Sequence, residues 1–436
     1  MPHMIPPVIL VPGITASVLH DEYELPPKAV WTTVLKRHYD RVTLHPEDQR
    51  YEFREPARVS PHGPFPLIYK DLVEELRDGL SDDGGAPVPV FPFGYDWRMP
   101  LDRTEERLAA FVDEVIDRTL LMRHYRDDSG YRDHPTVTLI GHSMGGLIIA
   151  GHIARHTAAK VDRVVTLATP FQGSFEAVLK VATGTADFGD DSGNARERRM
   201  ARLTPALYHL LPGFGGLDVA DDSLQTDLFH HAAWQPNVAG SITAQVAGWN
   251  VSAGDLFQAM LDQARAHRDR ILGLELSDPA NAESRSDLLR RDHWLAIAGA
   301  DCETRVGLRV DRDDTGAPRF DLRSDERRND WDPKSKGDRR DTGDGTVPLR
   351  GAIPPFLEES RLVCVTPRDF GYWELRDRTL SSLVGFHGLI PKMNMLHRLI
   401  IRFLLGKGDG YGNTWGRRLP GVEQWNPPLA PLREKD

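Results

Sequence analysis

The stretch VTLIGHSMGGLIIAGHIARH constrains the fold of this chain more than any other part of its sequence. It places Ser143 between a run of β-favouring residues and an apolar segment with helical spacing, and Gly141 and Gly145 lie two positions to either side. A sharp turn from strand to helix needs glycine at both positions, because a larger side chain would collide with one of the two elements. The stretch therefore predicts a strand, a strained turn that presents the serine, and a buried helix.

Apolar runs and helical stripes alternate on both sides of this turn. Continuous apolar strands that alternate with helices are typical of a mostly parallel sheet covered by helices on both faces, so we predict an α/β fold. One of the helices opens with Thr104 in the pattern T-E-E, which resembles a helix cap. The expected strands lie near residues 6–13, 88–97, 136–140, 161–168, 293–301 and 361–366, and the expected helices span 67–80, 104–125 and 143–156.

The alternation is interrupted twice, and these interruptions suggest the domain organisation. Residues 20–66 are polar and proline-rich without a clean period, which indicates a lid-like excursion. Residues 171–291 hold helical pieces but no convincing core strand, which indicates an inserted cap. We therefore expect a core made of residues 1–170 and 292–405, followed by a tail over 406–436.

Charge and composition exclude several classes of protein. The 436 residues carry a formal net charge of -10, which argues against a nucleic-acid partner because such proteins need a basic face. No apolar run approaches the length of a membrane span, and the start of the chain does not resemble a secretion signal. We expect a cytoplasmic protein with at most peripheral membrane contact. Cys302 and Cys364 form no disulfide framework and no zinc-binding spacing.

A serine nucleophile needs a base that a carboxylate orients. With this type of strand, turn and helix, the acid and then the histidine follow the serine along the chain. Asp344 in DTGDGTVPL is the preferred acid because glycines flank it, and Asp341 is the second candidate.

The preferred base is His387, which precedes the final apolar helix and has Gly388 beside it. His397 falls inside that helix among apolar residues, so we interpret it as a packing or surface histidine. His142 is a weaker competitor, because neighbouring side chains in a sharp turn diverge.

Acyl transfer also needs backbone donors for the negatively charged oxygen of the tetrahedral intermediate. The first expected donor is the amide of Met144, directly after the nucleophile. The second is the amide of Ile14, in the loop after the first strand.

Two further patterns resemble metal sites without completing them. Residues 311–316 imitate the start of a calcium loop, but Leu322 stands where a bidentate glutamate is needed, so a hairpin with its turn at 313–318 is the better interpretation. His230 and His231 have no third ligand at a suitable spacing. We expect neither a metal nor a cofactor.

Several segments together resemble the lecithin:cholesterol acyltransferase-like family of α/β-hydrolases, in a bacterial-type form. The resemblance spans nearly the whole chain and implies a hydrolase fold with a lid and a cap over an acyl pocket. GYDWR and GDGTVP are moderately specific, whereas GHSMGG alone would indicate only an α/β-hydrolase. The matching segments are PVILVPGITASVL, FGYDWR, GHSMGG, LATPFQGS, TPALYHLLPG, GDGTVPL and the HG of residues 387–388.

The resemblance also implies roles for aromatic residues. Trp31 lies where the family's lid carries aromatics, and Trp97 ends a core strand near the site, so we expect both, together with Phe171, to contact substrate. Asp96 and Arg98 are interpreted as a scaffolding pair. The chain departs from the animal members of the family, since it lacks their secretion signal and lid cysteine pair, and Lys392 stands near the position of their second histidine.

The sequence therefore predicts a serine hydrolase that acts on acyl esters, phospholipids among them, through an acyl-enzyme. Lipase, phospholipase and O-acyltransferase activities are all compatible with the motifs, because no residue decides between water and an alcohol as acceptor. The alternatives are a soluble carboxylesterase on small esters and an inactive hydrolase-fold binding protein. The sequence predicts no oligomeric state.

Overall fold

The fold is described from a computed structural model. The description covers residues 4–429 except 33–37, 82–85, 157, 185–194, 275–287, 290–291, 323–325, 328–339, 372–373, 375–384 and 409–415. Among these residues, no helix has the length and apolar character that crossing a membrane requires. Cys302 and Cys364 are both free thiols.

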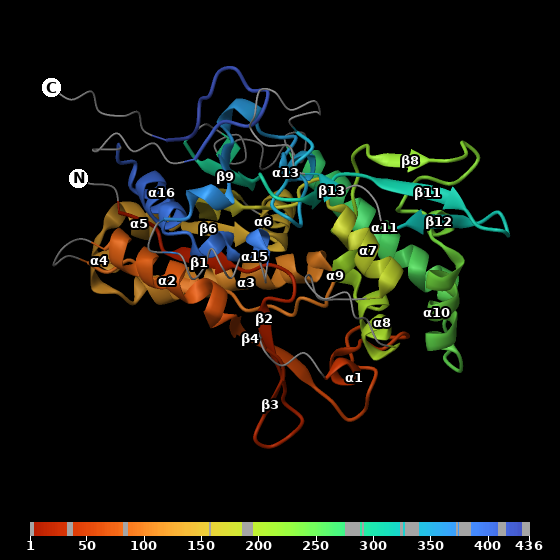
Figure 1. The fold of residues 1–436 in the computed structure, drawn as a ribbon. Helices are drawn as coiled ribbons and strands as arrows, with labels where there is room; N and C mark the ends of the chain where they lie inside the picture. Colours follow the sequence, from red (N-terminus) through yellow and green to blue (C-terminus); the bar gives the residue numbers. More distant parts are fainter. Residues whose placement is uncertain are drawn as a thin grey trace.

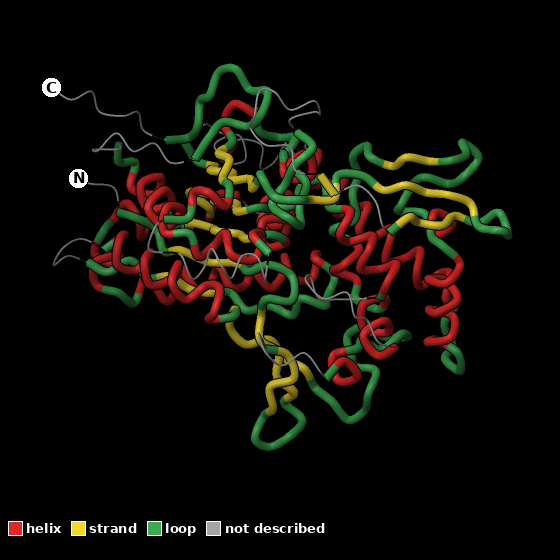
Figure 2. The backbone as a smooth tube through the Cα atoms, viewed as in Figure 1, coloured by secondary structure: helices red, strands yellow, loops and turns green. Residues whose placement is uncertain are grey.

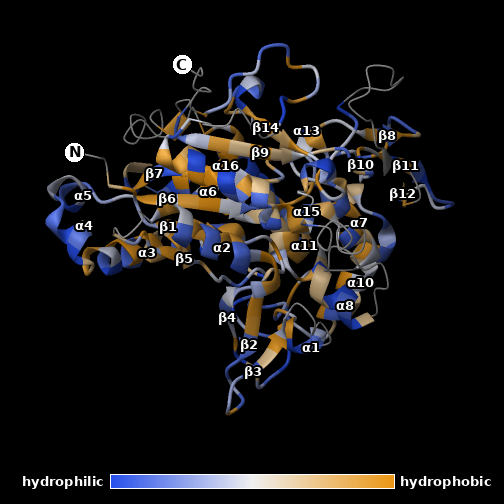
Figure 3. Ribbon diagram, turned by 60° about the vertical axis from the view of Figure 1, so that its left-hand side comes forward, coloured by the Kyte–Doolittle hydropathy of each residue, from blue (hydrophilic) through white to orange (hydrophobic). Residues whose placement is uncertain are grey.

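A six-stranded, all-parallel sheet forms the centre of the molecule (Figure 1). Its strand order is β14-β9-β7-β6-β1-β5, so the first strand of the chain lies next to the strand that leads to Ser143. The strands are mostly buried, which explains their continuous apolar sequence (Figure 3). The predicted α/β class is confirmed. The strands are β1 (Val8–Val11), β5 (Val90–Pro92), β6 (Val137–His142), β7 (Val161–Leu167), β9 (Trp294–Gly299) and β14 (Val363–Val365).

Helices α2 (Pro66–Leu80) and α16 (Asn394–Leu405) pack against each other on the sheet, and α3 (Leu101–Leu120) packs against α6 (Met144–Arg155). The apolar stripe predicted for α2 is buried, since Leu72, Leu76 and Leu80 are almost fully covered. Shorter elements connect or follow these helices. They are α4 (Arg123–Asp127), α5 (Ser129–Asp133), α13 (Leu349–Ala352), α15 (Phe386–Leu389), β10 (Thr304–Arg305) and β13 (Glu326–Arg327).

The predicted start of α3 is wrong. The helix begins at Leu101 rather than Thr104, and its N-cap is Pro100, with no side-chain capping bond. Proline before the first turn presets the backbone dihedral there, and Thr104 with Glu105 is then buried inside the helix. The predicted strand near 88–97 is also too long, because β5 ends at Pro92.

The segment predicted as a lid contains a three-stranded antiparallel sheet, here called the lid sheet, that projects from the core (Figures 1 and 2). Its strand order is β3-β2-β4, and the short helix α1 (Tyr39–Val42) follows β3. The strands are β2 (Ser17–Asp21), β3 (Lys28–Trp31) and β4 (Val59–Pro64).

A buried ion network ties this excursion to the core. Arg98 binds Asp96 through two hydrogen bonds of 2.8 and 2.7 Å, which confirms the expected pair. The same guanidinium donates to Glu52 (3.2 Å) and to the Val42 carbonyl (3.1 Å), both in the excursion. Because Arg98 is fully buried, removing one partner would leave an uncompensated charge inside the protein.

Residues 171–184 and 195–274 are mainly helical and lie beside the core (Figure 2). The short strand β8 (Leu217–Val219) pairs in parallel with β11 (Leu308–Arg312), which forms the predicted hairpin with β12 (Pro318–Asp321). This small sheet joins residues on both sides of position 291, so the division into cap and core at that position stays a prediction. The helices are α7 (Phe175–Thr183), α8 (Ala195–Arg202), α9 (Pro205–Tyr208), α10 (Pro236–Val246) and α11 (Ala253–Leu272).

Candidate active site

Ser143 lies at the turn between β6 and α6, as its sequence context predicts. Its backbone dihedrals are φ 54° and ψ −126°, a strained conformation for a residue with a side chain. A Cβ on Gly145 would stand 2.2 Å from the carbonyl oxygen of Val11, and one on Gly141 would stand 2.7 Å from the Gly146 amide nitrogen. The glycines are therefore required because α6 begins directly against β1 and β6.

The structure brings the predicted nucleophile, base and acid together. His387 Nε2 lies 2.9 Å from Ser143 Oγ, and His387 Nδ1 lies 2.7 Å from Asp344 Oδ2. The other carboxylate oxygen of Asp344 accepts the backbone N–H groups of Thr346 (3.0 Å) and Val347 (2.7 Å). These bonds hold the carboxylate in one orientation, so it can hold the imidazole in turn.

Burial strengthens these contacts. Asp344 is 1% exposed, Ser143 6% and His387 8%. The backbone N–H of His387 also donates to the Asp344 carbonyl (3.1 Å), which ties α15 to the Asp344 turn independently of the two side chains. Hydrogen bonds between charged and polar groups gain strength where water is excluded.

The competing candidates lie outside this arrangement. Asp341 pairs with Arg350 at 3.7 Å. His397 is buried in α16, and its Nε2 hydrogen-bonds the Pro391 carbonyl at 2.7 Å, which confirms the interpretation as a packing residue.

The loop after β1 contacts the serine directly. A Cβ on Gly13 would stand 3.1 Å from Ser143 Cβ, so the loop passes close beside the nucleophile. The Gly13 N–H is already used, because it donates to Tyr69 Oη at 3.0 Å. Ile14 carries the next amide of this loop, and Met144 carries the first amide of α6, where N–H groups have no acceptor within the helix. These are the two amides predicted as oxyanion donors.

A hydrogen-bonded chain that the sequence did not indicate runs behind the site. Tyr69 Oη accepts from Gly13 and lies 2.8 Å from His142 Nδ1, and His142 Nε2 lies 3.1 Å from the His387 carbonyl oxygen. The carbonyl can only accept, so His142 carries its proton on Nε2 and Tyr69 donates to Nδ1. Burial, followed by the nearby His387, holds the pKa of His142 well below its usual value, so this ring stays neutral.

The sequence did not predict these hydrogen bonds between Tyr69, His142 and the His387 carbonyl, for two reasons. Tyr69 falls on the same helical stripe as Leu72 and Leu76, which makes it indistinguishable from a core residue. From its sequence position, His142 is considered only as a competing base. His142 hydrogen-bonds the carbonyl of His387, 245 positions further along the sequence, and no local sequence pattern indicates such a contact.

The three aromatic residues predicted to contact substrate are all buried. Trp31 donates from Nε1 to the Thr15 carbonyl at 2.8 Å, and its ring lies 4.8 Å from that of Trp97. Phe171 packs instead on Phe356, with ring centres 5.4 Å apart. Trp31 therefore joins the lid sheet to the loop that carries Ile14, and the substrate contacts of these residues stay a prediction.

The other features singled out in the sequence have structural explanations. Asp313 Oδ1 accepts from the amides of Thr315 (2.8 Å) and Ala317 (2.9 Å), so this carboxylate closes the predicted hairpin turn. His231 Nδ1 contacts Gln258 Oε1 at 2.9 Å. A cavity of about 510 Å³ lies near Gln172 and Phe214, and none of Ser143, Asp344 and His387 lines it.

Comparison with protein families places this chain in a known group. The family model "Lecithin:cholesterol acyltransferase" matches residues 65–278, a stretch that includes Ser143 and Met144. The chain belongs to this family. It is therefore an α/β-hydrolase of the lecithin:cholesterol acyltransferase type, and Asp344 and His387 lie beyond the matched residues.

Two further similarities are more distant. A stretch of 112 residues is 28% identical to GPI inositol-deacylase B of Yarrowia lipolytica (strain CLIB 122 / E 150), covering 25% of this chain and 12% of that protein. The chain thus spans about an eighth of that relative. A chain in the crystal structure of the Tle4-Tli4 complex matches with a TM-score of 0.61 and 12% identity, over 92% of this chain and 98% of that one. At this identity the likeness shows the fold alone.

Proposed function

We propose that the protein is a serine hydrolase that cleaves acyl esters through an acyl-enzyme. The observation that carries this proposal is the continuous hydrogen-bonded arrangement of Ser143, His387 and Asp344, with both distances below 3 Å. A binding protein would gain nothing from keeping all three groups aligned, so the arrangement favours catalysis over an inactive hydrolase fold.

In the first half of the proposed reaction, His387 Nε2 takes the proton of Ser143 as Oγ attacks the ester carbonyl carbon. Asp344 stabilises the imidazolium that forms. The neutral state of His142 matters here, because its ring centre lies 5.1 Å from that of His387 and a second positive charge there would oppose protonation of the base.

The carbonyl oxygen of the ester becomes negatively charged as the bond to Oγ forms. The amides of Ile14 and Met144 donate to this oxygen in the proposed mechanism. His387 then returns its proton to the leaving alcohol, and the acyl group stays on Ser143. In the second half, water deprotonated by His387 attacks the acyl carbon and releases the acid. An alcohol at the same place would instead yield a new ester.

We propose an acyl lipid, with phospholipids as the leading class, as the substrate. Support comes from the family, whose description names an acyl transfer from lecithin, and from the relative whose name describes removal of an acyl group from a lipid anchor. The two residues whose amides are the proposed oxyanion donors, Ile14 and Met144, carry buried apolar side chains, which is compatible with an apolar ester.

Labelling with a fluorophosphonate tests the nucleophile. The wild type should react and Ser143→Ala should not, while His387→Ala should react far more slowly than the matched control His397→Ala. Circular dichroism of each variant checks that the fold is retained. A folded wild type that fails to label, or a Ser143→Ala variant that keeps its ester turnover, contradicts the proposal.

A second experiment tests the substrate class. Hydrolysis of p-nitrophenyl esters of increasing chain length is compared with release of fatty acid from phosphatidylcholine vesicles, with and without an added long-chain alcohol. We expect preference for long chains and vesicles, and the product ratio with alcohol measures transfer. Turnover restricted to short soluble esters would replace the lipid substrate with a small-ester carboxylesterase activity.

A further inference from the structure

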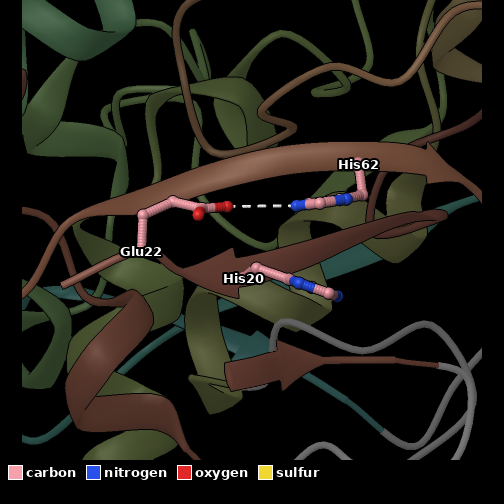
Figure 4. Close-up of side chains that lie close together, drawn as sticks. All are labelled: His20, Glu22 and His62. Atoms are coloured by element: carbon pink, nitrogen blue, oxygen red, sulfur yellow. Dashed lines mark hydrogen bonds and ion pairs between the residues drawn. The ribbon is translucent and has the colours of Figure 1, made fainter. Parts of the chain in front are cut away.

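Three potential metal ligands, none of which belongs to the Ser143, Asp344 and His387 arrangement, lie close together in the lid sheet (Figure 4). His20 lies in β2, Glu22 directly follows that strand, and His62 lies in β4. In the antiparallel register His20 stands opposite Ser60. Since side chains alternate between the two faces of a strand, His20 and Glu22 share the face that Ser60 and His62 occupy on the neighbouring strand.

The distances between these groups are close to those around a bound ion. One ligand atom from each of the three side chains lies within 4.8 Å of the others. His62 Nε2 is 3.0 Å from Glu22 Oε1, and the rings of His20 and His62 stack with centres 3.8 Å apart. Ligand atoms about 2.0–2.2 Å from a tetrahedral ion are separated by roughly 3.3–3.5 Å, so modest side-chain rotations would suffice.

The surroundings keep the ligand groups oriented and accessible. Ser60 Oγ donates to Glu22 Oε1 at 2.6 Å, which is the kind of hydrogen bond that orients metal-binding carboxylates. The side chain of His62 is 48% exposed and that of Glu22 29%, so an ion can reach them from solvent.

We propose that His20, Glu22 and His62 form a binding site for a divalent transition-metal ion, with Zn²⁺ as the best match. Two imidazole nitrogens and one carboxylate oxygen suit Zn²⁺, whereas Ca²⁺ and Mg²⁺ prefer oxygen ligands throughout. Three protein ligands leave a fourth position of the tetrahedron to water.

The proposed ion acts as a clip that stabilises the lid sheet. Its ligands join residue 22 to residue 62 and so close a loop of about 40 residues, which lowers the entropy of the unfolded chain. The clipped strand β2 begins shortly after Thr15, whose carbonyl accepts from Trp31 of β3. A rigid lid sheet therefore supports the loop that carries Ile14.

Metal binding by the full-length protein tests the site. Protein treated with EDTA and desalted is titrated with ZnCl₂ by calorimetry, and metal retained after gel filtration is counted by mass spectrometry. We expect one Zn²⁺ per chain for the wild type, no stoichiometric binding for His20→Ala or His62→Ala, and roughly tenfold weaker binding for Ser60→Ala. MgCl₂ and CaCl₂ should give no binding.

The pair of partly exposed His230 and exposed His231 supplies the matched control. Substituting both by Ala should leave Zn²⁺ binding unchanged, because their rings stack on each other far along the chain from the lid sheet. Circular dichroism confirms that each variant is folded. The metal measurement does not depend on turnover, so failure of the proposed esterase activity leaves it unaffected.

Thermal unfolding gives a second readout. Zn²⁺ should raise the melting temperature of the wild type and of the His230→Ala/His231→Ala control, but not that of His62→Ala. Two results overturn the proposal: absence of a bound ion in the wild type at micromolar Zn²⁺, or loss of binding in the control with retention in His62→Ala. For His62, whose side chain is half exposed, substitution by Gln provides a second variant if Ala impairs folding.

Discussion

The candidate active site and the lid sheet each gather three polar side chains, but they differ in how far those side chains are buried. The first joins Ser143, Asp344 and His387, which are distant in sequence. The second joins His20 and Glu22, two positions apart, with His62 of the neighbouring strand. At the candidate active site, backbone amides already donate hydrogen bonds to the Asp344 carboxylate, and close contacts at the glycines fix the neighbouring turns. In the lid sheet, the side chains are partly open to solvent. Burial therefore holds the side chains of the candidate active site in one arrangement, whereas the partly exposed side chains of the lid sheet remain accessible to the proposed ion.

The largest expected effect comes from the buried acid. Asp344→Asn should lower kcat by about 10⁴-fold, because the amide that replaces Oδ2 turns the imidazole to the wrong tautomer. The fold should survive, since the side-chain oxygen can still accept from Thr346 and Val347. Steady-state kinetics measure the loss. Asp341→Asn is the control, and a comparable loss there would mean that the acid is misassigned.

The next effect compares one glycine from each region. A Cβ on Gly145 would stand 2.2 Å from a backbone oxygen, whereas a Cβ on Gly63 in the lid sheet would meet nothing within 4 Å. Gly145→Ala should therefore cost about 3 kcal/mol of unfolding free energy, and Gly63→Ala about 0.5 kcal/mol or less. Urea denaturation measures both values. An equal loss of unfolding free energy in the two variants would show that position 145 tolerates a side chain as well as position 63 does.

A smaller effect is expected from the hydrogen-bonded chain behind the site. Tyr69→Phe leaves the Gly13 amide and His142 Nδ1 without their partner, which loosens the loop that carries Ile14. We expect kcat to fall about tenfold with little change in KM. The control Tyr125→Phe removes another buried hydroxyl, one that donates to the Ile5 carbonyl, and should leave kcat unchanged. A loss in both variants would point to stability rather than positioning.

The smallest effect concerns the exposed end of the lid sheet. Leu25, in the turn between β2 and β3, is 91% exposed, and Leu121 at the end of α3 is 80% exposed. If the lid sheet meets a lipid surface, Leu25→Asp should lower vesicle hydrolysis about threefold, because partial insertion gains only part of the roughly 1.5–3 kcal/mol of full burial. Hydrolysis of a soluble p-nitrophenyl ester should not change. Leu121→Asp should affect neither substrate, and an equal loss from both variants would exclude a special role for the lid sheet.

Sequence patterns predicted the core better than the lid. The strand before Ser143 and the helix after it are contiguous with the turn, so local preference and tertiary packing favour the same structure. The start of α3 was mispredicted because Thr104 looked like a cap, while Pro100 and the burial of Glu105 decide where the helix begins. In residues 20–66 the strands lack a clean alternation, and only their pairing reveals them.

The sequence by itself determined the turn at Ser143, because the two glycines and the strained serine are neighbours whose steric requirements are local. It also indicated Asp344 and His387 as the proposed acid and base, since each has a neighbouring glycine and both follow Ser143 in the expected chain order. Only the tertiary structure decided the contact of Tyr69 with His142, which requires α2 to pack beside the end of β1. The same holds for His20, Glu22 and His62. Their meeting depends on the register of β2 against β4, and register arises from strand pairing rather than from any one segment.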